Sequence, residues 1–283
     1  MGSRAWSARC CAIASEPPII RIDDPQDLRI APYRDVRERD LVGRDGLFIA
    51  EGEVVLRGLL QSRLHSPVSL LLAENRVAGL APLLAGLPDT VPVYAASQAA
   101  LDGIVGFPLH RGILALGRRG PMPDAAALLA GMARRALVVV LFGTANHDNL
   151  GGVFRNAAGF GADAVLLDRH CCDPLYRKAI RVSVGATLLL PWARLGPAED
   201  PVALLTGQGF AAVALSPSGS APLARYQRPD RVAALFGAEG PGLPPALMAR
   251  LQSLSIPMAG GFDSLNLATT SGIVLYHLAC AGS

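Results

Sequence analysis

The stretch ALVVVLFG, residues 136–143, is an unbroken apolar run that ends in a glycine. Strands buried on both faces of a parallel sheet have this composition, because neither face contacts water. A polar loop follows, and then the small and apolar segment NLGGVFRNAAGFG, residues 149–161, which predicts a helix. A strand followed by a helix is the repeating unit of a parallel α/β domain.

The same alternation continues toward the C-terminus. Further strands are expected at residues 163–168, 209–216, 231–237 and 253–258. Helices are expected between and after them, including residues 173–185 and 266–278. Residues 136–283 are therefore expected to form an α/β domain with a mostly parallel sheet and right-handed connections.

A second, smaller α/β domain is expected ahead of this one, over residues 19–116. Its strand-like runs cover residues 46–50, 68–73, 91–95 and 112–117, and its helix-like runs cover residues 52–63, 76–86 and 97–105. Residues 117–135 begin as a Gly/Pro-rich linker and continue as a helix, so the domain boundary is expected there. Residues 1–18 are expected to form a disordered tail.

The composition restricts the class of protein. The chain has 283 residues, of which 51% are hydrophobic, so it is long enough for two domains with their own cores. No apolar run reaches the roughly 20 residues that span a bilayer. The five cysteines are odd in number and lack CxxC spacing, which favours neither a disulfide framework nor a metal site and suits a reducing cytoplasm.

The net charge of +3 is too small to indicate a nucleic-acid-binding protein by itself. Lys178 is the only lysine, so arginine is the default cation of this chain. The presence of an arginine therefore does not by itself indicate a functional site.

Polar residues gather in three loops that follow predicted strands. The loop after residue 143 leads to Asn149 and Arg155, the loop after residue 237 carries Glu239, and the loop after residue 258 carries Asp263, Ser264 and Asn266. In an open parallel sheet, ligands bind at the carboxyl ends of the strands. The three loops are therefore expected to share one crevice.

Each of these residues also has a purely structural interpretation. Asn149, Ser264 and Asn266 are residue types that cap helices. Arg155 is either an edge ion pair or a group that faces an anion, because its predicted helix is otherwise small and apolar. The glycines around Glu239 suit a surface turn as well as a backbone that approaches a ligand. Lone histidines and adjacent cysteines, such as Cys171 and Cys172, are assigned no role.

Three segments carry a specific resemblance: residues 146–167, 234–244 and 255–278. They resemble, in order, the three motifs of the SpoU/TrmH family of RNA 2′-O-ribose methyltransferases in the SPOUT superfamily. Residues 173–186 also resemble the family's segment between the first two motifs, and the match extends from Leu137 to the C-terminus. Residues 46–60 and 110–117 are similar to the small substrate-binding domain that often precedes the catalytic domain.

The resemblance implies a C-terminal domain with a trefoil knot that binds S-adenosylmethionine, a homodimer formed through the knotted domains, and structured RNA, ribosomal or transfer, as substrate. The positions that match the family's cofactor site are Leu215, Ser216, Phe236, Gly237, Glu239, Gly240, Ile256, Met258, Leu265 and Asn266.

Arg155 matches the family's essential arginine, and Asn149, Glu239, Ser264 and Asn266 would orient it and the ribose. A guanidinium seldom deprotonates, so we favour a role for Arg155 as a phosphate clamp and stabiliser of the developing alkoxide over true base catalysis. Arg155, Arg177, Lys178 and Arg181 are the expected RNA contacts, although the last three also suit a solvated helix face.

The sequence argues against two other functions. A catalytically silent RNA-binding relative would have the same fold, but the intact polar residues of the three motifs argue against it. A dinucleotide-dependent oxidoreductase would need a GxGxxG opening, which the first strand and helix lack.

Overall fold

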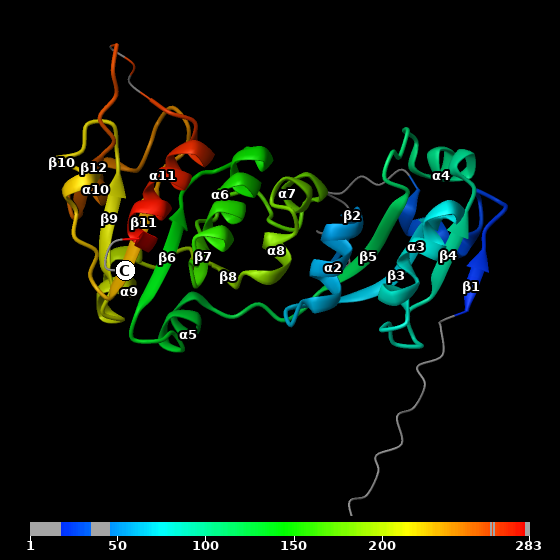
Figure 1. Ribbon diagram of the computed structural model, residues 1–283. Helices are drawn as coiled ribbons and strands as arrows, with labels where there is room; N and C mark the ends of the chain where they lie inside the picture. The colour runs from blue at the N-terminus through cyan, green and yellow to red at the C-terminus, as the bar shows by residue number, and fades with distance from the viewer. Residues whose placement is uncertain (1–17, 35–45, 261, 263, 281–283) are drawn as a thin grey trace, which may run out of the picture.

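The computed structural model describes residues 18–34, 46–260, 262 and 264–280. The chain folds around two sheets, which form two lobes that lie side by side (Figure 1). Most of the expected N-terminal tail lies outside the described residues, and so does Asp263.

A five-stranded mixed sheet forms the first lobe, in the order β1-β4-β3-β5-β2. β1, β4 and β3 are parallel, whereas β5 is antiparallel to β3 and to β2. The strands are β1 (Ile19–Arg21), β2 (Leu47–Glu51), β3 (His65–Ala73), β4 (Val93–Ala96) and β5 (Ile113–Arg119). The helices of this lobe are η1 (Leu28–Tyr33), α2 (Glu53–Gln61), α3 (Glu74–Leu84) and α4 (Gln98–Val105).

A seven-stranded sheet forms the second lobe, in the order β10-β12-β9-β11-β6-β7-β8, and all its strand pairs are parallel. This confirms the expected parallel α/β architecture. The strands are β6 (Ala136–Leu141), β7 (Ala164–Leu167), β8 (Trp192–Arg194), β9 (Ala211–Leu215), β10 (Ala221–Pro222), β11 (Arg231–Phe236) and β12 (Gln252–Ser255). The helices are α5 (Ala125–Ala130), α6 (His147–Gly159), α7 (Arg177–Val182), α8 (Ala186–Leu189), α9 (Pro201–Gly207), η2 (Leu223–Arg225), α10 (Pro245–Met248) and α11 (Leu267–Cys280).

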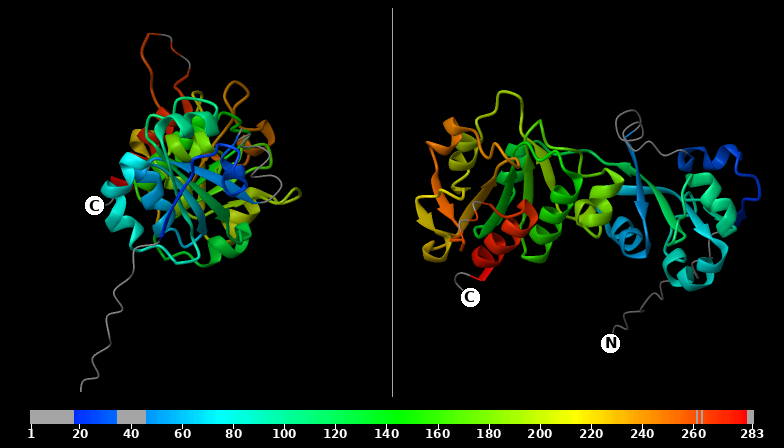
Figure 2. Two further views of the ribbon diagram at one scale, coloured as in Figure 1. Left: turned by 90° about the vertical axis from the view of Figure 1, so that its right-hand side faces the viewer. Right: turned by 90° about the horizontal axis from the view of Figure 1, so that it is seen from above.

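Helices cover both faces of this sheet, and β6 shows why. All six residues of β6 are buried, and they alternate between two hydrophobic clusters. Leu137, Val139 and Leu141 face α6, α7, α8 and α11, while the residues between them face α5, α9 and α10. α6 and α11 lie next to each other on one face (Figure 2, right).

The chain reverses its direction of travel through the sheet beside β6. From β6 it proceeds to β7 and β8, then crosses to β9 and later inserts β11 between β9 and β6. Such a switch point opens a crevice at the carboxyl ends of the strands. The loops after β6 and β11 both leave the sheet at this place.

The two lobes share a continuous hydrophobic cluster that runs from α2 to α8. Ser62 Oγ donates a hydrogen bond of 2.6 Å to the carbonyl of Leu188. Arg119 forms an ion pair with Asp173 across the same boundary. The lobes therefore pack directly against each other at α2, α8 and the segment before α7.

The structure departs from the sequence expectations mainly in short elements. α8, β8, β10 and α10 have two to four residues each, too few for a periodic pattern. The last strand ends at Ser255, three residues before its expected end, because Ile256 and Met258 leave the sheet and line a pocket. Within the described part of the chain, no helix is both long and apolar enough to cross a bilayer.

Candidate active site

The three polar loops meet at the side chain of Asn149, which is buried in the first turn of α6. Its amide nitrogen donates a short hydrogen bond to Glu239, which follows β11. Its amide oxygen accepts a hydrogen bond of 2.8 Å from Asn266, which precedes α11. The predicted convergence of the three segments is thus confirmed by hydrogen bonds between residues 90 and 117 positions apart.

The capping roles belong to other residues than Asn149. Asn146 is the N-cap of α6, and its side chain accepts from the backbone of Asp148 and Asn149. Asn266 combines two roles, because its amide oxygen also accepts from the backbone of Ala268 at 2.9 Å and Thr269 at 3.2 Å. Asn149 therefore links the motifs instead of capping a helix.

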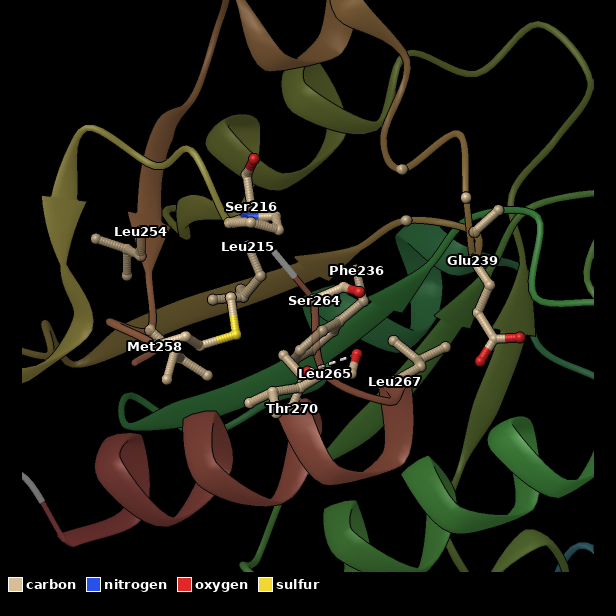
Figure 3. A pocket seen from close by; sticks show the side chains of 16 residues that line it. Leu215, Ser216, Phe236, Glu239, Leu254, Met258, Ser264, Leu265, Leu267 and Thr270 are labelled. Carbon is tan, nitrogen blue, oxygen red and sulfur yellow. Dashed lines mark hydrogen bonds between the residues drawn. The ribbon is translucent and has the colours of Figure 1, made fainter. Parts of the chain in front are cut away.

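Next to this hydrogen-bonded junction lies a pocket bounded by the ends of β9, β11 and β12 and the start of α11 (Figure 3). Apolar side chains line much of it, with Met258 on one side and Leu265 and Thr270 above the first turn of α11. The lining residues are Leu215, Ser216, Pro217, Phe236, Gly237, Ala238, Glu239, Gly240, Gly242, Leu254, Ile256, Met258, Ser264, Leu265, Leu267 and Thr270.

The wall formed by the loop after β11 consists of backbone. A Cβ atom added to Gly237 would lie 2.1 Å from the carbonyl carbon of Gly242 and 2.2 Å from the nitrogen of Leu243. Gly240 and Gly242 have φ angles of 84° and 69°, in the left-handed region that favours glycine. The loop is thus folded back on itself, which explains the glycines of this motif and leaves main-chain groups beside the pocket.

The pocket includes almost all the residues predicted to bind the cofactor. Leu215, Ser216, Phe236, Gly237, Glu239, Gly240, Ile256, Met258 and Leu265 line it, as does Ser264. Asn266 does not line it; its side chain donates to Asn149, which in turn donates to the lining residue Glu239.

Arg155 lies elsewhere in the single chain. It is exposed on α6 and lines a second cleft, between the two lobes, together with Arg181. The structure of one chain therefore does not bring this guanidinium into the pocket that holds Gly237 and Met258.

The two remaining predicted RNA contacts are engaged by carboxylates. Lys178 Nζ lies 2.6 Å from a carboxylate oxygen of Asp148. Arg177 Nη1 lies 3.6 Å from Glu51, and its guanidinium stacks on Phe107 with 4.6 Å to the ring centroid. Arg177 thus bridges the two lobes, a position that a sequence alone does not reveal.

The two thiols that follow β7, both among the described residues, are not activated nucleophiles. Burial raises the pKa of the Cys171 thiol to about 12 and that of Cys172 to about 11, so both thiols stay protonated at neutral pH. Burial, assisted by Lys178, lowers the pKa of His147, whose ring stacks on Tyr176. Among the residues that the structure describes, no group of His, Cys, Asp or Glu side chains could hold a metal ion.

Six pocket residues were not anticipated from the sequence: Pro217, Ala238, Gly242, Leu254, Leu267 and Thr270. Thr270 lies three positions after Leu267, which also lines the pocket, so helix phase places both on the same side of α11. Leu254 has no distinguishing signal, because it is one apolar strand residue among many.

Comparisons with known proteins agree with this geometry. The model of the SpoU rRNA Methylase family matches residues 136–276. An uncharacterized tRNA/rRNA methyltransferase of Mycobacterium bovis is 40% identical over 285 residues, which cover 97% of this chain and 96% of that protein. The 23S rRNA (guanosine-2′-O-)-methyltransferase RlmB of Acinetobacter baylyi is 29% identical over 195 residues, which cover 67% of this chain and 79% of RlmB. The AdoMet-bound rRNA methyltransferase of Sinorhizobium meliloti has a TM-score of 0.76 and 22% identity, with 92% of this chain and 97% of that one covered.

Proposed function

The chain belongs to the SpoU rRNA methylase family, and we propose that it transfers a methyl group from S-adenosylmethionine to the ribose 2′-hydroxyl of a nucleotide in ribosomal or transfer RNA. The name of the RlmB relative supports the 2′-oxygen as acceptor. The family model matches residues 136–276, which form most of the second lobe, and this supports the carboxyl ends of its strands as the place of the chemistry.

The observation that carries this proposal is the junction at Asn149. Its hydrogen bonds to Glu239 and Asn266 tie the first turn of α6 to the two loops that line the pocket. Structural capping alone requires no such link, because Asn146 already caps α6.

The pocket suits S-adenosylmethionine in its chemistry. Leu215, Ile256 and Leu265 offer apolar surface for the flat faces of an adenine, and the folded loop at Gly237 offers main-chain groups for its polar edges. When bound there, the cofactor supplies a methyl group activated by a positively charged sulfur. The C-terminal trefoil knot implied by the family resemblance is part of the same proposal.

We assign Arg155 to the RNA and not to the cofactor. Its guanidinium would clamp a phosphate next to the reacting ribose and stabilise the negative charge that develops on the 2′-oxygen as the proton leaves. Asn149, Glu239, Ser264 and Asn266 would then act as positioning residues that fix the loops and the ribose.

Since one chain does not bring Arg155 to the pocket, we propose that the active enzyme is a homodimer in which the second copy supplies it. The exposed side of α11 next to α6 carries apolar surface suited to such contact. Ile273 is 40% exposed and Tyr276 60% exposed, and the Tyr276 ring packs edge-on against Phe160. The chain's natural compartment is proposed to be the cytoplasm, where RNA substrates and reducing conditions coexist.

A calorimetric titration tests the cofactor and the role of Arg155 together. Wild-type protein is expected to bind S-adenosylmethionine and not NAD. The Arg155→Ala variant is expected to bind the cofactor within severalfold of wild type and to have no detectable methyl transfer to unmodified RNA. A loss of cofactor binding in this variant would contradict the assignment of Arg155 to the RNA.

Mixed dimers test whether Arg155 acts across the interface. An Arg155→Ala chain should be inactive alone, and a Gly237→Ala chain, which binds the cofactor at least about tenfold more weakly, should have little activity alone at S-adenosylmethionine concentrations well below its Kd. If Arg155 acts on the partner's pocket, mixing the two should restore about a quarter of wild-type activity, because half of the dimers then contain one complete site. No restored activity would show that Arg155 serves the pocket of its own chain.

The same measurements separate the enzyme from a catalytically silent RNA-binding relative. Such a relative would bind RNA without methylating it, and the Arg155→Ala substitution would alter only its RNA affinity.

A further inference from the structure

A cleft of about 780 Å³ lies between the two lobes of a single chain, away from the cofactor pocket. Its size is within the roughly 300–1,000 Å³ that is usual for ligand clefts. One wall belongs to the first lobe, at the start of α2 and the segment before β5, and the other belongs to α6 and α7. Figure 1 shows α2 facing α7 and α8 across this boundary.

The cleft concentrates positive charge from four separate segments. Its basic residues are Arg76, His110, Arg111, Arg155 and Arg181, all exposed. Glu53 is the single carboxylate among its lining residues, and Arg57 and Arg76 already engage it at 2.8 and 3.4 Å. The net charge of the cleft is therefore strongly positive, in a protein whose total charge is only +3.

Three of these guanidinium groups are exposed and have no partner among the described residues. Within the part of the chain that the structure describes, Arg111, Arg155 and Arg181 form no ion pair and no side-chain hydrogen bond. Like charges held around one cleft repel each other and gain nothing for the stability of the fold. The stability of the fold therefore does not account for their convergence, whereas an anion in the cleft would.

The position of Arg111 argues further against a stabilising role. Its side chain lies over Gly52, the N-cap of α2, where an added Cβ would come within 2.9 Å of the guanidinium. The N-terminal end of a helix carries partial positive charge, so a cation there is unfavourable.

Five apolar residues also line the cleft: Val54, Val55, Ile113, Val182 and Val184. Val184 has a φ angle of 55°, an unfavourable conformation for a β-branched residue, yet its side chain is 38% exposed in the cleft. Apolar side chains and exposed arginines that line one cleft together match a nucleotide strand, whose bases are flat and whose phosphates are charged.

We propose that this cleft binds a single-stranded segment of the substrate RNA adjoining the methylated nucleotide, with Arg111 and Arg181 on its phosphates and Val184 against a base. This inference rests on the proposed function. It assigns a specific RNA surface to the first lobe and makes Arg155 the link between that surface and the reacting ribose.

Fluorescence anisotropy with a labelled 12-nucleotide single-stranded RNA tests the phosphate contacts. The Arg111→Ala variant is expected to bind the probe about five- to twentyfold more weakly than wild type at low salt. The slope of log affinity against log salt should also fall by about 0.7, the value for one lost phosphate contact on a single strand. The matched control is Arg118→Ala, because Arg118 is an exposed arginine of the same lobe that does not line the cleft.

Equal affinities and slopes for Arg111→Ala and Arg118→Ala would overturn the proposal, and so would failure of the wild-type protein to bind the probe at 50 mM salt. Cofactor titration distinguishes this failure from failure of the proposed function. If S-adenosylmethionine binds and RNA is methylated while Arg111→Ala behaves as the control, only the cleft assignment is wrong.

A second variant separates RNA contact from folding. Val184→Gly relieves the left-handed strain, so its melting temperature should stay equal to that of wild type or rise. Its affinity for the RNA probe is nevertheless expected to fall about threefold or more, because the side chain against the base is lost. A Val184→Gly variant with wild-type RNA affinity would exclude Val184 from the binding surface.

Discussion

Replacing Gly237 by alanine tests whether the loop after β11 must keep its folded shape to hold the cofactor. The added methyl carbon would stand 2.1 Å from the carbonyl carbon of Gly242 and 2.2 Å from the nitrogen of Leu243. Ordinary van der Waals contact begins near 3.4 Å. Because the obstructing atoms are backbone, the loop itself must shift by more than about 1 Å.

The structural cost of this shift is moderate, because the loop is at the surface. Residues 239–242 are exposed, and the antiparallel bridge between Ala238 and Gly242 is the main local order to be lost. Overpacking of this kind typically costs about 1–3 kcal/mol in the free energy of unfolding. The same shift moves the backbone wall of the pocket, so the affinity for S-adenosylmethionine should fall at least about tenfold, or about 1.4 kcal/mol.

Urea unfolding and calorimetric titration measure these two effects separately. Gly207→Ala is the matched control, because no atom lies within 4 Å of the added Cβ at this position of α9. That variant should be as stable as wild type or more stable by up to about 1 kcal/mol, with unchanged cofactor affinity. If Gly237→Ala binds S-adenosylmethionine as tightly as Gly207→Ala does, the pocket is not the cofactor site.

Three further substitutions examine the junction of the motifs and the boundary between the lobes. Asn149→Ala removes the hydrogen bonds to Glu239 and Asn266, so it should lower the free energy of unfolding by about 2–4 kcal/mol and the cofactor affinity tenfold. Asn156→Ala, which removes the bonds to Ala268 and Ser271, should lower stability alone, and equal cofactor affinities in the two variants would contradict the role of Asn149. Burial, assisted by Arg119, lowers the pKa of His65 to about 4, below its unfolded value near 6.5. The unfolded chain therefore takes up the proton first, so stability is complete above about pH 6.5 and falls as the pH drops toward 4, by about 1–2 kcal/mol at pH 5 in urea unfolding. His65→Gln should lose this dependence, and an equally steep pH profile in that variant would refute the assignment.

The longer strands and helices of the second lobe follow directly from its sequence. A run such as residues 136–141 is apolar at every position, because β6 is central and both its faces are covered. The glycines around Glu239 suit either a surface turn or a backbone that approaches a ligand, and the structure shows Gly237 against the backbone of Gly242 and Leu243, with Gly240 and Gly242 in the left-handed region of a turn.

The partners of individual polar residues were not predictable to the same degree. Asn146, Asn149 and Asn266 are all suited to helix caps, and only the spatial contacts separate the linking residue from the caps. The capped helix and the linked loops are 90 or more positions apart in the chain, so no local pattern encodes which amide faces which.

The contacts and exposure of the charged residues on α6 and α7 depend on how the two lobes dock. The sequence suggests that Arg177 is an exposed cation, but in the structure it pairs with Glu51 and stacks on Phe107, both in the first lobe. Arg155 and Arg181 remain exposed, because they line the cleft that the docked lobes leave between them. Docking is decided by contacts between distant segments, which periodicity does not describe.

The central claim is that the acceptor is a ribose 2′-oxygen of RNA. Unmodified ribosomal and transfer RNA would be incubated with the protein and S-adenosylmethionine carrying a labelled methyl group, and the RNA then hydrolysed in alkali. Because alkaline cleavage needs a free 2′-hydroxyl, this account predicts the label in alkali-resistant dinucleotides. Label in ordinary mononucleotides, which would carry the methyl group on a base, would contradict it, as would RNA without label.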